Sequence, residues 1–417
     1  MTTIQKQDTN PVAHLTPEDI EAMGRELDAI GQEVFASLGA KDAAYIRRVI
    51  STQRYLELGS RAVLLFSLFP PAWLVGTAGL GVAKILENME IGHNVLHGQW
   101  DWMRDPKIHS TTWEWDNATP ADQWKHSHNE LHHTYTNVIG KDNDLGYGIM
   151  RVDEDQPWTP ASLGQPIWNF VNMLFFEYGI ASYDLELRGA VKSGRTKDPV
   201  FRRNAKNVVK KIRRQATKDY VVHPLLSGPS FLHTLGANVV ANMIRNVWSH
   251  SIIMCGHFPE GVETFEKRSI EGETRGDWYL RQMIGSANIS GGTPIHVMSG
   301  NLSHQIEHHL FPDLPSNRYA EVAPQVKALF EKYGLSYCSR PFIPQLYSAW
   351  HRVFRLSTPN GWLETTTVRN LPSQLKLLWA MVRGGPRVRR AAQARMVQQA
   401  RRQRAAAATP SRESVAA

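Results

Sequence analysis

Thiols are nearly absent from this chain of 417 residues, which has only two cysteines, Cys255 and Cys338. Two distant cysteines exclude a scaffold built on disulfides, a four-cysteine zinc site and an iron–sulfur cluster held by the chain's own thiolates. A reducing, intracellular environment is the simplest interpretation. An apolar stretch is also missing from the first forty residues, and the polar opening MTTIQKQDTN predicts that no signal peptide is present.

Positive charge is in excess, with a formal net charge of +8, and much of it lies in residues 188–218 and 383–404. Neither segment alternates with stacking aromatic residues as a nucleic-acid groove does, so we expect no nucleic-acid partner. Basic segments near apolar ones are typical of the cytoplasmic face of a membrane. We interpret the second segment as part of a solvated basic tail that covers residues 356–417.

Long apolar runs are few, and each is interrupted. Residues 61–86 are almost free of charge but contain Pro70 and Pro71, and residues 219–258 contain Arg245. A bilayer crossing takes about 20 helical residues. We therefore interpret each run as a helical hairpin. The four expected spans are residues 52–69, 72–97, 219–236 and 238–257.

The predicted fold is an all-α integral membrane protein, with four transmembrane helices in two hairpins and a cytoplasmic helical cap that holds a two-metal site. Residues 1–50 form an amphipathic helical region, because apolar residues recur at helical spacing after a cap at Thr16. The main domain covers residues 51–355, and residues 167–187 form a helix in the membrane plane. We expect a multi-pass protein of the cytoplasmic membrane with both termini on the cytoplasmic side.

Histidines gather in three clusters, and each cluster places imidazoles three or four residues apart, on one face of a helix. Seven or more imidazoles exceed the ligands of one tetrahedral ion and suit two metal ions. Imidazole binds iron, copper and zinc alike, and an apolar setting favours oxygen chemistry, hence iron. The clusters are HNVLH (His93, His97), HNELHH (His128, His132, His133) and HQIEHH (His304, Gln305, His308, His309).

The segments HNVLHGQWDW, WKHSHNELHHTYTNVIGKDNDLG and SHQIEHHLFPDLPSNRY resemble the three histidine boxes of the membrane fatty acid desaturases. The bacterial acyl-CoA branch is the most similar, over roughly residues 50–355. The resemblance implies a non-haem enzyme with two iron ions that uses O2 and two external electrons to insert a cis double bond into an acyl chain. Saturated C16 to C18 acyl-CoA and the Δ9 position are the expected substrate and product position.

The resemblance also implies a set of metal ligands, and it leaves some of them open. A further ligand is expected at the end of the last span, where His257 is favoured over His250, which follows Asn246 at a spacing that some members use. Gln305 and His304 are expected either to bind the metal themselves or to orient the histidines that bind it. Asp142, Asp144 or Asn137 could orient imidazoles from outside. The expected ligands are His93, His97, His128, His132, His133, His257, His308 and His309.

Electron transfer needs a partner, because the chain has no HPGG haem signature, no ferredoxin-like cysteine spacing and no GxGxxG motif. The expected donor is an external ferredoxin or flavoprotein reductase that passes on electrons from NADPH. Arg202 and Arg203 are candidates for binding the phosphates of an acyl-CoA. Two alternatives stay open, namely a hydroxylase on the same scaffold and a non-catalytic metal-binding membrane protein such as a transporter.

Overall fold

Residues 11–142 and 144–408 are described by the computed structural model, and nearly all of their regular structure is helical. Within these ranges the only sheet is a parallel pair of three-residue strands, β1 (Asn288–Ser290) and β2 (Ser339–Pro341), with Ile289 opposite Arg340. The chain forms two compact units. The larger contains the chain up to Gly148 together with Val171–Ala349, and the smaller contains Ile149–Phe170 together with the chain from Trp350 onward.

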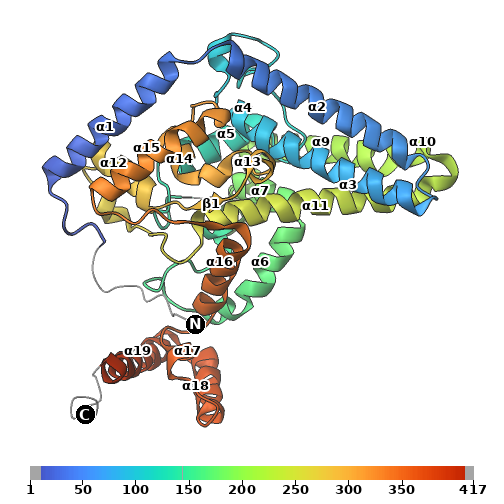
Figure 1. Cartoon of the computed structure of the whole chain (residues 1–417). Coiled ribbons are helices and arrows are strands. Elements are labelled where there is room, and N and C mark those ends of the chain that lie inside the picture. Colours follow the sequence, from blue (N-terminus) through green and yellow to red (C-terminus); the bar gives the residue numbers. More distant parts are fainter. Residues whose placement is uncertain (1–10, 143, 409–417) are drawn as a thin grey trace, which may run out of the picture. The chain divides into compact units, whose positions relative to one another are not determined.

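Three long helices of the larger unit, α2 (Ala40–Leu64), α3 (Pro70–Leu86) and α11 (Phe231–His257), lie along one another (Figure 1). Their shared core contains Leu64, Leu80, Ala237 and Ala241. Gly76 allows α2 and α3 to approach closely, because a Cβ atom at this position would lie 2.7 Å from Cγ of Leu64. This close packing fixes the direction of α11, which ends at His257, and of α3, which continues into η1 with His93.

No helix in the described ranges is both long enough and apolar enough to cross a membrane. The predicted four transmembrane helices and the multi-pass placement in the cytoplasmic membrane were therefore wrong. The first predicted span, residues 52–69, fell mostly inside α2, which carries Arg54, Glu57 and Arg61. The second continued an α-helix to residue 97, whereas α3 ends at Leu86 and a π-helical turn follows.

The second predicted hairpin is also absent. Residues 219–236 are divided among η7 (Lys218–Val222), α10 (His223–Leu226), η8 (Gly228–Ser230) and the start of α11. Helix α11 runs without a break through the expected turn near residue 237. Two of its polar side chains are buried and paired inside the protein: Asn238 donates from Nδ2 to the carbonyl of Asp219 at 2.8 Å, and Arg245 pairs with Glu177.

A buried ionic network, which we call the Asp219 network, ties these helices together. The Asp219 carboxylate is fully buried and accepts hydrogen bonds from Nη2 of Arg61 at 2.8 Å and Nζ of Lys84 at 2.7 Å. Asn242 of α11 donates to the same carboxylate at 3.2 Å. Although burial alone would raise the pKa of Asp219, the charges of Lys84, Lys218 and Arg61 hold it well below its usual value. The network therefore joins α2, α3, η7 and α11 through one ionised group.

Helix α1 (Pro17–Ala36) covers the other side of the larger unit, against α12 (Arg275–Ile284) and α15 (Tyr319–Lys332) (Figure 1). It starts where the sequence predicts, because the Thr16 hydroxyl accepts from the backbone N–H of Asp19 and the Asp19 carboxylate accepts from Thr16. The core below α1 contains Met23, Leu27 and Phe311. Through Phe311, this core supports α14 (Gln305–Leu310), which carries the third histidine cluster.

The smaller unit joins an internal segment to the C-terminal helices α17 (Trp362–Thr365), α18 (Leu371–Arg383) and α19 (Pro386–Ala408). Its apolar core contains Trp158 of the internal segment together with Trp362 and Met381. The indole N–H of Trp158 also donates to the carbonyl of Ser357 at 2.8 Å. The sequence predicted only a solvated basic tail here, because contacts between segments so far apart leave no local pattern.

The remaining helices are short or connect these parts. They are η1 (Glu87–His93), α4 (Asn94–Leu96), η2 (Asp101–Met103), α5 (Ala121–Lys125), η3 (His126–His132), η4 (Leu145–Gly148), η5 (Pro160–Gly164), α6 (Gln165–Leu174), α7 (Phe176–Asp184), α8 (Leu187–Ser193), η6 (Arg195–Lys197), α9 (Pro199–Thr217), η9 (Lys267–Ile270), α13 (Thr293–Met298), η10 (Leu302–His304), η11 (Ser316–Arg318) and α16 (Phe342–Ser357). The helix predicted over residues 167–187 is thus divided between α6 and α7.

Candidate metal centre

His93 ends the π-helical turn η1 and His97 directly follows α4, while His128 and His132 lie on the π-helical turn η3, instead of the continuous α-helices that their spacing predicted. A π-helical turn has i→i+5 hydrogen bonds and is common at functional sites. The imidazoles still face one another: the ring centroids of His93 and His97 are 4.6 Å apart, and those of His128 and His132 are 5.0 Å apart. The local geometry differs from the prediction, but the paired presentation of imidazoles is the same.

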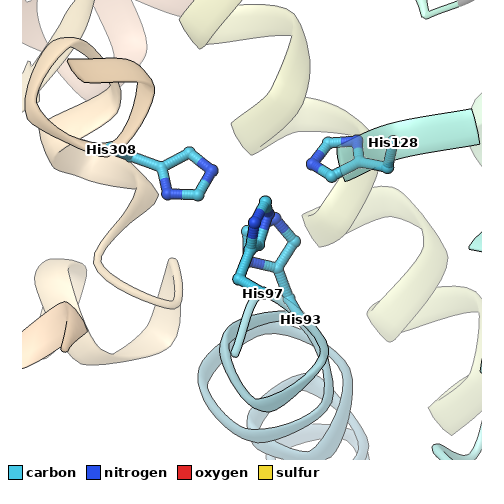
Figure 2. A group of neighbouring side chains, drawn as sticks. All are labelled: His93, His97, His128 and His308. Atoms are coloured by element: carbon cyan, nitrogen blue, oxygen red, sulfur yellow. The ribbon is translucent and has the colours of Figure 1, made fainter. Parts of the chain in front are cut away.

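One group of four imidazoles combines all three clusters: His93, His97, His128 and His308. One ring nitrogen of each lies within 4.8 Å of the others. Figure 2 shows the rings of His308 and His128 approaching from opposite sides, while His93 and His97 point to the same centre from one helix. Four nitrogens converging on one point form a ligand set for a metal ion.

A second group contains His132, His257 and His309, whose ligand nitrogens also lie within 4.8 Å of one another. Its members come from η3, from the last residue of α11 and from α14. His133 lies between the two groups, because its ring is stacked on that of His309 at 4.4 Å and is 4.8 Å from that of His308. All eight histidines expected as ligands are therefore neighbours in space.

The unpaired nitrogens of these rings fit bound metal ions. In the described residues, Nε2 of His97, His128 and His308 and both ring nitrogens of His133 are buried without a hydrogen-bond partner. An unpaired buried polar atom costs about 1–3 kcal/mol, and metal coordination would remove this cost. Burial and neighbouring imidazoles lower the pKa of His93 to about 3 and the pKa of His308 well below its usual value. Neutral imidazole is the form that binds metals.

In five of these rings, Nδ1 contacts an oxygen atom of a neighbouring residue, and this contact orients the ring. Two partners were suggested by the sequence: Asp142 lies 2.9 Å from Nδ1 of His132, and Asp144 lies 2.8 Å from Nδ1 of His128. Burial lowers the pKa of His132, but the charges of Asp142 and Asp144 outweigh it and raise that pKa to about 8. This imidazole is thus held by two anionic neighbours.

The other three orienting partners were missed by the sequence analysis. Asn94 contacts Nδ1 of His93 at 3.0 Å. The Tyr319 hydroxyl lies 3.1 Å from Nδ1 of His308, and the Gln282 side-chain oxygen lies 3.1 Å from Nδ1 of His309. Asn94 directly follows a cluster histidine, and Tyr319 ends the SNRY segment of the third box, so their positions gave a weak signal. Gln282 gave none, because it comes from α12, far from any cluster.

Replacing Asp142 with asparagine is expected to weaken metal binding by roughly 10- to 100-fold, the usual effect of losing a partner of a ligand histidine. Asp142 is almost fully buried, and it also accepts the backbone N–H of Asn137 at 2.8 Å. The measurement is retention of metal by purified protein against increasing chelator. Asp122→Asn is the matched control, since this side chain is 92% exposed on α5. Equal retention by both variants would contradict the orienting role.

The remaining candidates lie outside the histidine groups or at their edge. His250 packs its ring against Phe176, 5.2 Å away, and belongs to none of the groups found in the described residues. Asn246 accepts hydrogen bonds from the neighbouring Arg245. The His304 ring is stacked on His296 at 4.7 Å, whereas Gln305 lies 3.1 Å from Nε2 of His257. Arg202 and Arg203 are exposed on α9.

A cavity opens beside the histidines. His93, His128, His132 and His257 form one end of its lining. The walls are largely apolar and aromatic, with Met89, Trp115, Trp124, Phe176, Ile180, Ile253 and Leu302. An elongated apolar ligand would therefore lie directly against the candidate metal centre.

Comparison with known proteins gives the family of this helical protein, which gathers eight imidazoles beside an apolar cavity. The family model described as fatty acid desaturase matches residues 68–341. The chain belongs to the fatty acid desaturase family, as its histidine boxes predicted, and is an oxidoreductase. No solved structure matches the chain.

Named relatives span several kinds of desaturase. The chain is 48% identical over 360 residues to the NADPH-dependent stearoyl-CoA 9-desaturase of Mycobacterium tuberculosis, which covers 85% of this chain and 84% of the relative. It is 25% identical over 283 residues to the sn-1 linoleoyl-lipid 6-desaturase of Synechocystis, over 66% of this chain and 77% of that one. Fatty acid desaturase 3 of Bos taurus is 36% identical over 126 residues, 30% of this chain and 26% of the relative.

Proposed function

We propose that the chain inserts a cis double bond at the Δ9 position of saturated C16 to C18 acyl-CoA. The observation that carries this proposal is the apolar cavity with the imidazoles at one end, because it would hold an alkyl chain against the metal centre. The similarity to a stearoyl-CoA 9-desaturase over most of both chains supports the choice of substrate and position. Residues 51–355 form the proposed catalytic domain.

The proposed ligands are His93, His97, His128 and His308 for one iron ion and His132, His257 and His309 for the other, with His133 between them. Two bound irons would supply the O2 chemistry that removes hydrogen from an unactivated alkyl chain. The protein's own contribution is to orient the imidazoles through Asp142, Asp144 and Tyr319. Trp124, stacked on His128 at 4.4 Å, covers one face of this imidazole and lines the cavity.

Electrons come from an external ferredoxin or flavoprotein reductase supplied by NADPH, in keeping with the NADPH dependence named for the mycobacterial relative. Arg202 and Arg203 are the proposed contacts for the phosphates of the CoA group, since both are exposed on the basic helix α9.

Expression in cells without their own Δ9 activity, followed by gas chromatography of fatty acids, tests the function. We expect new Δ9 monounsaturated C16 or C18 acids that depend on the expressed chain. Hydroxylated acids in their place would show that the same scaffold performs hydroxylation, and the absence of both products with an active reductase present would refute the proposal. Metal analysis of the purified protein is expected to give about two irons per chain, as the two imidazole groups imply.

A further inference from the structure

The cavity has two distinct ends, which are defined by the faces of α11 and α7. On α11, His257, Ile253, Ser249 and Arg245 line it at intervals of four residues, so they share one face. At a rise of about 1.5 Å per residue, His257 and Arg245 are roughly 18 Å apart along the helix. On α7, the Tyr183 hydroxyl donates to Asp144, at the histidine end. Glu177, at the other end of α7, pairs with Arg245.

The end formed by Arg245 and Glu177 is closed. The Arg245 side chain is 1% exposed and that of Glu177 is 2% exposed. Neighbouring groups hold the pair in place: Asn246 accepts from Nε of Arg245 at 3.3 Å, and the carbonyl of Asp116 accepts from Nη1 at 3.5 Å. Asn88 donates to the same carbonyl at 3.1 Å. The ion pair at this end of the cavity is therefore buried and held by hydrogen bonds from Arg245 to Asn246 and Asp116.

The closed end also differs chemically from the walls. Oε2 of Glu177 is buried and has no hydrogen-bond partner in the described part of the chain. The walls nearer the histidines include apolar side chains, namely Ile180 on α7, one turn from Glu177, and Ile253 on α11, two turns from Arg245. A flexible apolar side chain could shift to admit a longer ligand. A buried ion pair resists displacement, because separating its partners leaves a desolvated charge and destabilises the protein strongly.

We propose that the Arg245–Glu177 pair is the floor of the acyl cavity and sets the longest chain that the enzyme accepts. The inference rests on the proposed function, since it requires an acyl chain attached to a bulky carrier. The carrier has no passage at the closed end, so the free methyl end of the chain points to the floor. Each methylene beyond the available depth must then press against a fixed polar surface.

The first test removes both charges together, in the double variant Glu177→Leu with Arg245→Met, because replacing one partner would leave the other charge unpaired. Purified wild type and variant receive equal mixtures of saturated acyl-CoAs from C14 to C22. We expect the ratio of C20 and C22 products to C18 product to rise by roughly tenfold or more, since one methylene in an apolar pocket is worth about 10- to 200-fold. An unchanged ratio would overturn the proposal.

The second test shortens the cavity without changing the ion pair. It therefore still tests the proposal if the double variant does not fold. Ile180→Trp places a large side chain on α7, three residues from Glu177 on the same face. We expect the ratio of C14 to C18 product to rise by roughly tenfold or more. Val191→Trp is the control, because Val191 is 61% exposed on α8 and does not line the cavity. Equal ratios in both tryptophan variants would refute the floor.

Calorimetric binding of the same saturated acyl-CoAs separates this inference from the proposed function. The floor predicts that affinity falls sharply beyond one chain length and that the double variant moves this limit to longer chains. Such a limit, together with a product that is not a double bond, would refute the desaturase assignment and retain the floor. Binding that is independent of chain length, with normal double-bond formation, would refute the floor alone.

Discussion

The His132→Ala variant is expected to form no detectable unsaturated product and to lose at least roughly a hundred-fold in metal affinity, more than the usual loss of an orienting partner. His132 belongs to the group with His257 and His309, and its ring is 2% exposed. Two histidines would remain in that group, which is too few to hold an ion firmly. The measurements are gas chromatography of products and iron content after purification.

His126→Ala is the matched control for this variant. His126 lies on the same π-helical turn, η3, but its side chain is 66% exposed and contacts Glu130 instead of the metal centre. We expect its product yield and iron content to equal those of the wild type. Retained iron and activity in His132→Ala, or equal losses in the two variants, would contradict the assignment of the second histidine group.

The Asp219→Ala variant is expected to lose about 3–5 kcal/mol in free energy of unfolding, the effect of breaking a buried ion pair. Without this carboxylate, Lys84 is 2% exposed with the more distant Asp116 beside it, at 3.4 Å, and Arg61 keeps Glu57 and His223 as neighbours. The expected loss is large because desolvated cations have no water to replace the missing partner. Denaturant unfolding of wild type and variant at neutral pH measures it.

An exposed ion pair provides the comparison for Asp219→Ala. Glu26 accepts from Nζ of Lys332 at 2.6 Å, but both side chains reach solvent on the surface of α1 and α15. Glu26→Ala should therefore change the unfolding midpoint far less than Asp219→Ala, since water and salt screen an exposed pair. Equal shifts in the two variants would show that the Asp219 network does not stabilise the fold.

The sequence predicted the family and the fact that the clustered histidines lie close together. It could do so because the histidines of each cluster are only a few residues apart along the chain. It failed on the spans because hydropathy ignores pairing across the fold. Arg61 is a strong charge when read alone, yet it pairs with Asp219, 158 positions away. Arg245 likewise pairs with Glu177, on a different helix. Such partners are visible only in three dimensions.

Two features of the site were beyond sequence reasoning for a related reason. The π-helical turns η1 and η3 have the same residue spacing on paper as α-helical turns, so a search for residues at i and i+4 cannot distinguish them. The contact of Gln282 with His309 depends on how α12 packs on α14. Packing of this kind leaves no periodic trace along the chain.

The composition of the smaller unit has a consequence for biosynthesis. Its core places Trp158 against Trp362 and Met381. Along the sequence, these two segments are separated by residues 171–349 of the larger unit. At a synthesis rate of about 5–20 residues per second, the internal segment waits roughly 10 to 40 s for its partner to emerge from the ribosome. The histidine-bearing unit can assemble during that interval, whereas the core of the smaller unit closes only after Trp362 and Met381 have emerged.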